Sequence, residues 1–282
     1  MRRAYKAAIL ASMILVTLLL ALAISSGGMG NGVPYPTVRN LAFWYLKTTY
    51  NPFLLKVFSA AAPEAVTAIV WDYRGLDTLF ETSVFFLAIV ASLAIMRGIK
   101  IEVPKSFDPR RFGMSPIVKT VTKIMLGLII AVSASIALHG QLTPGGGFQG
   151  GSAAAVAPLI AIVIFSVYFT VRSGVRKESM LALRTAGLIG IGVTSFLAIL
   201  IGIFTHKAAF IFQNQPKSTA PAGLPNHILG VPMGGTLWLF NISEYLAVAA
   251  GFTIVFLLLS VPESVVKKHL KSEVEGGGES GG

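Results

Sequence analysis

The sequence contains no cysteine and little charge, and both absences narrow what the protein can be. Without cysteine, the chain forms no disulfide, holds no cysteine-ligated iron–sulfur cluster and performs no thiol catalysis. Charged residues occupy 12% of the 282 positions, about half the share typical of a soluble domain, while apolar residues occupy 54% and the mean hydropathy is +0.74. The solvent for most of this chain is therefore lipid.

Six stretches are long and apolar enough to cross a bilayer core of about 30 Å. The first follows Arg2 and Arg3 and could also be a secretory signal, but it is long for one and its cleavage-site match is loose, so we interpret it as an uncleaved anchor. The chain is thus predicted to be an all-α integral membrane protein with about six transmembrane helices. The predicted spans are Lys6–Ile24, Thr78–Met96, Val118–Leu138, Ser152–Val171, Leu181–Thr205 and Leu237–Val261.

Two further segments do not fit a spanning helix. The stretch Phe58–Val70 is apolar but short, and Pro63 and Glu64 interrupt it, which predicts a re-entrant or interfacial segment near 58–70. The tail Glu273–Gly282 is rich in glycine and glutamate, a composition that predicts disorder.

Acidic residues are scarce as well, 12 against 23 basic ones, which gives a net charge of +11. In a soluble protein this excess would suggest nucleic-acid binding. Here the cations gather between apolar runs, so membrane topology explains their positions and we predict no nucleic-acid partner. Six spans place every cation-rich region on one side, which the positive-inside rule identifies as the cytoplasm. We therefore predict a multi-pass cell-membrane protein with both termini cytoplasmic. The cation-rich regions are the N-terminal tip, the loop from Arg97 to Lys123, the loop from Arg172 to Arg184, and the tail from Lys267 to Lys271.

Ionisable residues crowd the entrance to the second predicted span. On a helix Asp77 and Glu81 share a face, and Arg74 lies three residues before Asp77 and can reach it. Neighbouring carboxylates beside a cation can hold a proton or Na⁺; the alternative is an ion-paired helix entrance that only fixes orientation. The ion-translocation candidates here are Asp72, Arg74, Asp77 and Glu81.

Glu244 lies about two turns inside the last predicted span, on one stripe with Asn241 and Tyr245. Polar groups in hydrocarbon cost free energy unless they face protein or water, so each is a functional candidate. A lone carboxyl of this kind can carry a proton or pair with a cation on a neighbouring helix. A purely structural interhelical hydrogen bond is the alternative.

Glycine dominates the turn between the third and fourth predicted spans. Such a run implies a tight backbone course packed against other helices. No Lys-Ser/Thr pair follows it, so it is not a Walker A phosphate loop. His139 could relay protons near neutral pH or simply cap a helix end. The structural turn comprises Gly140, Pro144, Gly145, Gly146, Gly147, Gly150 and Gly151.

The fifth predicted span carries a stripe of small residues that suits close helix packing. These residues recur every four positions: Ala186, Gly190, Thr194, Ala198 and Gly202. The chain shows no histidine cluster with metal-ligand spacing and no nucleophile–base pairing, so we expect no catalytic residues, no metal site and no cofactor of its own.

Two motifs resemble known families. The string from His139 to Gly151 is similar to the histidine-glycine and proline-triple-glycine-phenylalanine turn of the MnhB/MrpB subunit of multisubunit Na⁺/H⁺ antiporters, over about Ser115–Val261. The stretch Val70–Glu81 resembles the C-terminal end of the large MrpA subunit. Near the last helix, Asn241 and Ser243 stand where the MnhB/MrpB family usually has aspartate and glycine, and Glu244 is a further departure.

The resemblance implies a fusion of two antiporter pieces. Residues 1–114 would form an MrpA-like segment with two spans, 115–262 an MnhB/MrpB-like four-helix domain, and 263–282 a cytoplasmic tail. The resemblance also implies that the chain is a non-catalytic subunit that takes part in Na⁺ or proton translocation. Its partners would be other Mrp-type membrane subunits and lipid. The order of the two pieces favours an archaeal redox-driven complex, either membrane-bound hydrogenase or sulfane sulfur reductase. The cytoplasmic arm of such a complex holds iron–sulfur clusters. A stand-alone antiporter or a scaffold subunit that carries no ion remains the alternative.

Overall fold

The structure is a computed structural model that describes residues 2–26, 39–50, 57–99, 101–225, 227, 229–230, 235–267 and 269. The predicted disordered tail 273–282 lies outside these residues. The chain divides into two compact units, Met1–Trp44 and Tyr45–Gly282, each considered separately below.

The first unit contains the helix α1 (Arg2–Ser25) and the start of α2 (Asn40–Thr49). The predicted first span lies within α1, whose apolar part is Ile9–Ser25. That stretch is shorter than the long apolar helices of the second unit, although at 1.5 Å per residue it still covers most of a bilayer core.

The second unit contains five helices that are long and apolar enough to cross a membrane, so the predicted all-α membrane fold is confirmed. Their bounds lie within a few residues of those predicted. Ser115 caps α5, because its hydroxyl accepts from the Val118 N–H and Pro116 follows at the first helical position. The long helices are α4 (Gly75–Ile95), α5 (Pro116–Leu138), α6 (Gly147–Phe165), α8 (Lys177–Thr205) and α9 (Leu237–Leu259).

The fourth predicted span needs two corrections. The helix α6 begins at Gly147 rather than Ser152, so the end of the glycine run forms its first turn instead of a loop. Close packing on α9 outweighs the weak helix propensity of glycine there. The span is then interrupted at Ser166, which has a φ of 107°. The short helix α7 (Val167–Arg172) follows, and the Ser166 hydroxyl caps it by accepting from the Phe169 N–H.

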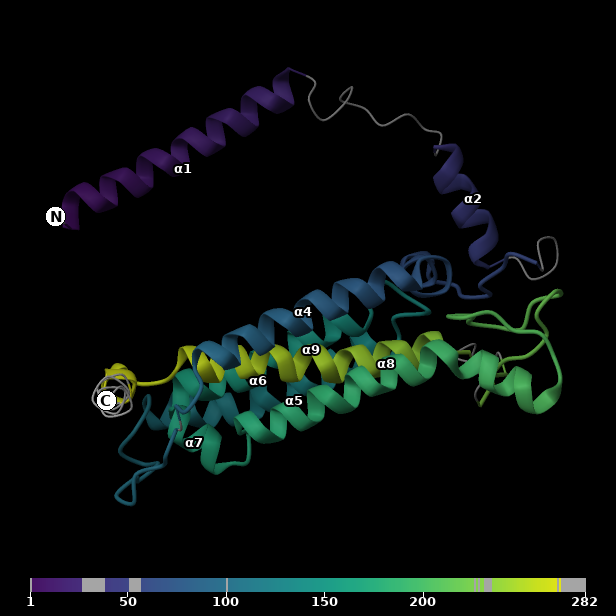
Figure 1. The fold of residues 1–282 in the computed structure, drawn as a ribbon. Coiled ribbons are helices and arrows are strands. Elements are labelled where there is room, and N and C mark those ends of the chain that lie inside the picture. Colours follow the sequence, from purple (N-terminus) through teal and green to yellow (C-terminus); the bar gives the residue numbers. More distant parts are fainter. Residues whose placement is uncertain are drawn as a thin grey trace, which may run out of the picture. The chain divides into compact units, whose positions relative to one another are not determined.

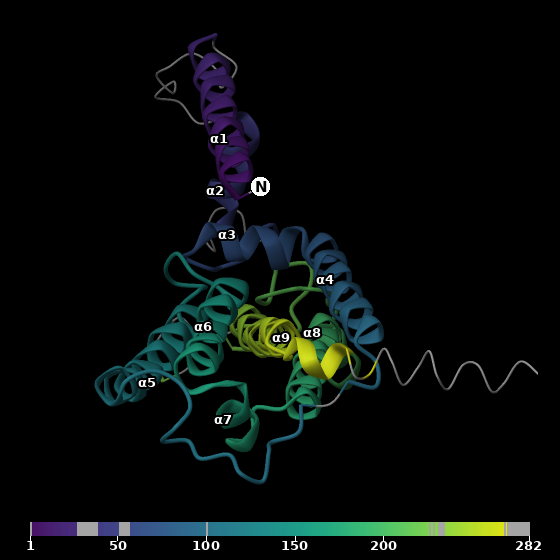
Figure 2. The same cartoon turned by 90° about the vertical axis from the view of Figure 1, so that its left-hand side faces the viewer.

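The helix α9 lies at the centre of the second unit (Figures 1 and 2). It packs between α6 and α8, with α5 against the far side of α6 and α4 along another side of α9. Apart from a few polar residues such as Asn241 and Glu244, α9 is apolar on all sides, as expected of a helix enclosed by other helices. In contrast, α4 and α5 expose large apolar side chains such as Phe80, Val84, Ile124 and Leu128. Those faces suit lipid or neighbouring subunits.

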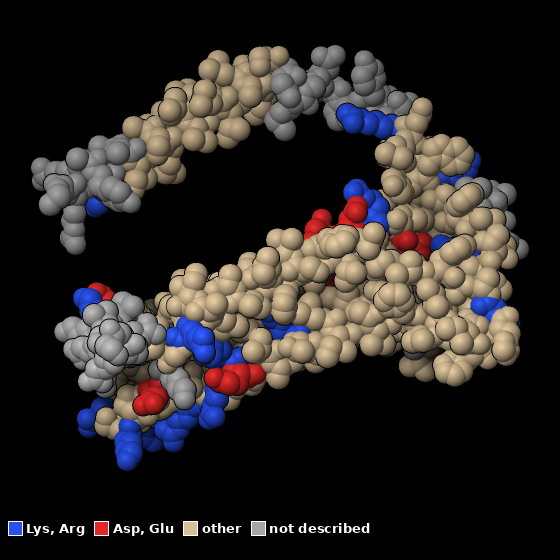
Figure 3. All heavy atoms as spheres, viewed as in Figure 1, with Lys and Arg blue, Asp and Glu red and all other residues tan. Residues whose placement is uncertain are grey.

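The two ends of this bundle differ in charge (Figure 3). At one end α4 and α9 finish and α5 and α8 start, and we call it the basic end. It gathers Arg97, Lys105, Arg110, Arg111, Lys119, Arg172, Arg176, Lys177 and Lys267. The opposite end carries the segments 57–74, 139–146, 206–225 and 235–236.

The segment Phe58–Val70 does not form a span, as predicted. After Glu64 it forms the single turn α3 (Ala65–Thr67), which continues into the π-helix η1 (Ala68–Tyr73) at the opposite end. Glu64 caps α3 by accepting from the Val66 and Thr67 N–H groups. The side chain of Trp71 is buried and stacks on Phe240 at the start of α9, with ring centroids 4.2 Å apart.

Candidate functional site

Glu244 lies in the interior of the bundle and only 8% of its surface is exposed. The Trp71 side chain and the Phe148 backbone N–H lie beside its carboxylate, and a Cβ atom at Gly147 would lie 2.7 Å from Glu244 Oε2. Phe148 is the second residue of α6, so the carboxylate lies against the positive end of that helix. The segment η1, the glycine run and α9 therefore converge on one carboxyl group.

The glycine run permits this approach because its members lack a Cβ atom. A Cβ at Gly147 would lie 2.5 Å from the Asn241 carbonyl oxygen and 2.6 Å from the Glu244 Cβ atom. At Gly151 it would lie 2.8 Å from the Tyr245 carbonyl oxygen. Any larger residue at these two positions would push α6 away from α9.

Among the other members of the run, Gly140, Gly145 and Gly150 also have close contacts, and Gly146 adopts a φ of 139°. Pro144 is exposed at the bundle end. The segment before η1 covers this run, because Thr67 Oγ1 donates to the Gly140 carbonyl at 2.5 Å and the Glu64 N–H to the Gln141 carbonyl at 3.0 Å.

Of the four candidates at the entrance to the second predicted span, Glu81 is the one whose charge acts on Glu244. The Glu81 carboxylate is close enough to exert a Coulombic effect on Glu244, while its own side chain is exposed on the surface of α4. Asp77 instead forms an ion pair with Arg74, whose Nε lies 2.7 Å from Asp77 Oδ2, and both side chains are exposed. Asp77 is thus held by Arg74, whereas the Glu81 charge reaches Glu244 as the weakest of the influences on that carboxyl group.

Asp72 lies apart from these carboxylates, at the opposite end. Its Oδ2 is 2.9 Å from Lys217 Nζ, and its Oδ1 accepts from the Asn214 N–H at 2.8 Å. Burial raises the pKa of the Asp72 carboxyl, and the Lys217 ammonium opposes that rise. Because the partners are about 145 residues apart, this pair fastens η1 to the loop before α9.

Asn241 and Tyr245 flank Glu244 on α9. Asn241 is buried beside Gly140, and the Tyr245 hydroxyl lies 3.3 Å from the buried Ser133 Oγ of α5. His139 is exposed and ends α5, with its Nδ1 3.0 Å from the Ser135 carbonyl oxygen. The structure therefore leaves His139 outside the carboxylate site.

The stripe of small residues on α8 only partly faces α9. A Cβ at Gly190 would meet the Ser243 side chain, and Thr194, Ala198 and Gly202 are buried. Ala186, however, is exposed, while its neighbour Gly187 packs against the Ser243 and Ala247 backbone. A repeat of four drifts about 40° per step from a helix of 3.6 residues per turn, so such a stripe cannot stay on one face for 16 residues.

The structure adds Arg184, which the sequence had suggested only as a topology cation. Only 1% of its surface is exposed, and it lies in the third turn of α8, where its guanidinium covers the Phe86 ring at 4.6 Å. The signal was present in the sequence, because Arg184 falls inside the predicted span Leu181–Thr205. Trp71 and Lys217 had no such signal, since their partners are distant in the chain.

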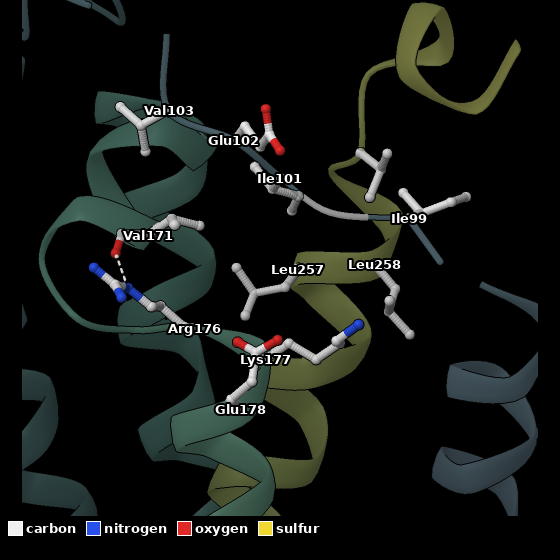
Figure 4. Close-up of a pocket in the computed structure, with 11 residues that line it drawn as sticks. Ile99, Ile101, Glu102, Val103, Val171, Arg176, Lys177, Glu178, Leu257 and Leu258 are labelled. Carbon is white, nitrogen blue, oxygen red and sulfur yellow. Dashed lines mark hydrogen bonds between the residues drawn. The ribbon is translucent and has the colours of Figure 1, made fainter. Parts of the chain in front are cut away.

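A cavity of about 310 Å³ opens at the basic end between α7, α8, α9 and the segment after α4. Figure 4 shows apolar side chains on its walls and the charged groups of Glu102, Arg176, Lys177 and Glu178 around it. Arg176 Nε donates to the Val171 carbonyl oxygen at 3.2 Å. Such a cavity can admit water and small ions. Among the described residues, no three histidine or acidic side chains are grouped closely enough to hold a metal ion.

Comparisons with known proteins give one matching domain model, a similar sequence and a shared fold. Residues 117–254 match the model of a domain related to the MnhB subunit of Na⁺/H⁺ antiporters. An uncharacterised protein of Methanocaldococcus jannaschii is 28% identical over 273 residues, which cover 90% of this chain and 96% of that protein.

Two solved structures share the fold with a TM-score of 0.56. One is a chain of the membrane-bound sulfane sulfur reductase, an archaeal respiratory membrane complex, at 23% identity; the match covers 89% of this chain and 96% of that one. The other is a chain of the Mrp complex from Dietzia sp. DQ12-45-1b, at 18% identity. That match covers 89% of this chain but 26% of the other, so the shared fold there is part of a longer polypeptide.

Proposed function

We propose that this multi-pass membrane protein is a non-catalytic subunit of an Mrp-type antiporter module that takes part in Na⁺ or proton translocation, because residues 117–254 match the MnhB-related domain model. The observation that carries this proposal is the Glu244 carboxyl group. It is buried in a membrane helix, beside the Trp71 side chain and the first turn of α6, and the charge of a second acid, Glu81 of α4, acts on it. Ionisable groups in such surroundings are costly and usually serve ion or proton transfer.

The two carboxylates would have different tasks. Glu244 is enclosed, so it can keep an ion from water, whereas Glu81 is exposed on α4 and can exchange that ion with a neighbouring subunit. Two carboxylates provide too few oxygen ligands for firm binding of a hard cation, so the partner subunit would supply others. Na⁺ or a proton is the transported species and not a resident cofactor.

We place this module in a redox-driven archaeal complex of the sulfane sulfur reductase or membrane-bound hydrogenase type. The nearly complete coverage of the sulfane sulfur reductase chain supports that setting. The partners would be other Mrp-type membrane subunits and a cytoplasmic arm with iron–sulfur clusters, which this cysteine-free chain cannot bind by thiolates. Mass spectrometry of the complex purified through a tag on this chain tests the setting, because a stand-alone antiporter would bring no iron–sulfur subunits.

The Glu81→Gln variant tests the translocation role. The amide keeps the size of the side chain but cannot bind or release a proton in the same way, so Na⁺ uptake by proteoliposomes containing the purified complex should fall about tenfold or more. Asp77→Asn is the matched control, because it removes an acid one turn away whose partner is Arg74. A scaffold role predicts wild-type uptake from assembled Glu81→Gln complex across pH.

We further propose that the basic end faces the cytoplasm and that both termini lie there. The chain lacks native cysteine, so single cysteines can be introduced without background. Ser218→Cys, an exposed position in the loop before α9, should react with an impermeant maleimide added outside cells, whereas Ser173→Cys at the basic end should not. The reverse pattern would invert the orientation.

A further inference from the structure

The guanidinium group of Arg184 is a buried charge without a hydrogen-bond acceptor. Its Nε, Nη1 and Nη2 atoms are all inaccessible to solvent, and none has an acceptor among the described residues. Its neighbours are aromatic: the Phe85 and Phe86 rings of α4 lie 5.9 and 4.6 Å from its Cζ atom. Cation–π contact offsets only part of the cost of removing a charge from water.

Arg184 also lies within the predicted span Leu181–Thr205 of α8. It is seven residues, or about 10 Å, from the first residue of α8. Phe85 and Phe86 occupy the middle of α4, and a Cβ at Gly251 of α9 would lie 3.6 Å from the Arg184 Nε atom. The side chain therefore fills the space where α4, α8 and α9 meet.

One face of α9 connects the carboxylate site, Arg184 and the cavity at the basic end. Glu244, Gly251 and Leu258 are seven residues apart, so they share a face and are separated by about 10 Å each. Glu244 marks the carboxylate site, Gly251 adjoins Arg184, and Leu258 lines the cavity at the basic end. The guanidinium thus lies between the carboxylates and that cavity.

We propose that Arg184 is a charge barrier that stops cations from passing freely between the Glu81–Glu244 site and the cavity at the basic end. The proposal rests on the function proposed above. It adds to the ion-carrying acids of this chain a residue that determines charge selectivity. A unit charge about 10 Å away in an effective dielectric constant of about 20 changes the occupancy of a passing cation by roughly tenfold. Without this charge, Na⁺ would leak down its gradient without being coupled to work.

The test compares Arg184→Met and Arg184→Lys in the whole complex. Methionine retains a flexible apolar stem and removes the charge, whereas lysine keeps the charge. Passive ²²Na⁺ entry into proteoliposomes is measured with no redox substrate and no pH gradient, under a membrane potential imposed with K⁺ and valinomycin. We expect roughly tenfold faster entry for Arg184→Met and wild-type entry for Arg184→Lys.

Each outcome decides the proposal separately from the translocation role. If Arg184→Met assembles and its passive entry equals that of wild type, the barrier is wrong, whatever Glu81→Gln shows. If Glu81→Gln leaves coupled uptake unchanged while Arg184→Met leaks, the barrier stands and the carboxylate role fails. Arg184→Gln provides a second neutral variant. If neither neutral variant assembles while Arg184→Lys does, an acid from another subunit neutralises the guanidinium, which overturns the proposal.

Discussion

Replacing Glu244 with glutamine is expected to lower coupled Na⁺ uptake about 100-fold while the complex still assembles. This loss is the size associated with removing a group that transfers a proton. Glutamine has the shape of glutamate and keeps a polar oxygen beside Trp71 and the Phe148 N–H, so the packing of α9 should survive. The effect should exceed that of Glu81→Gln, because Glu244 is the enclosed member of the pair.

Tyr245→Phe is the matched control for this variant. It removes the hydroxyl that lies 3.3 Å from Ser133 Oγ, and therefore an interhelical contact, on the same turn of α9. Uptake per assembled complex should remain near that of wild type. If both variants reduced uptake equally, the loss would reflect helix packing and not the ionisable group.

Gly147→Ala is expected to destabilise the subunit by about 1–3 kcal/mol, the usual cost of overpacking a core. The added Cβ would lie 2.5 Å from a carbonyl oxygen of α9 and 2.6 Å from the Glu244 Cβ, and neither backbone can move without parting α6 from α9. The thermal midpoint of the purified complex and its yield should both fall.

Two other glycines serve as controls, because a Cβ at Gly127 of α5 or Gly192 of α8 would have no neighbour within 4 Å. In open helical positions alanine is favoured over glycine by roughly 0.5–1 kcal/mol, so these variants should be neutral or slightly more stable. A midpoint for Gly147→Ala as high as that of Gly127→Ala would refute the close packing of α6 on α9.

The sequence predicted the spans well because long apolar runs leave few alternatives in lipid. The second unit has helices at all five predicted positions, and the family resemblance drawn from the glycine turn is confirmed by the match over 117–254. The break at Ser166 was missed, because an apolar run continues through it and the positive φ depends on packing. The starting point of α6 was missed for a similar reason: glycine normally indicates a turn, and only the approach of α9 makes the run helical.

The candidate site was harder to predict, because its members come from four distant segments. Glu244 and Glu81 stand out as acids in or near apolar runs, but their proximity depends on how α4 lies along α9. Periodicity suggested the pair Asp77 and Glu81, yet the local ion pair with Arg74 takes up Asp77. Trp71 could not have been linked to Glu244 before the fold was known. The burial of Arg184 was not predicted either, although its position inside the predicted span Leu181–Thr205 was a sequence signal for it.

Coupled ²²Na⁺ uptake per assembled complex, measured for Glu81→Gln, Glu244→Gln and the double variant, tests the central proposal most directly. If the two carboxylates form one translocation site, the double variant should transport no more slowly than the slower single variant, because the second change removes a group already disabled. Uptake by the double variant at the wild-type rate would contradict any ion-carrying role for this pair and leave the chain a scaffold.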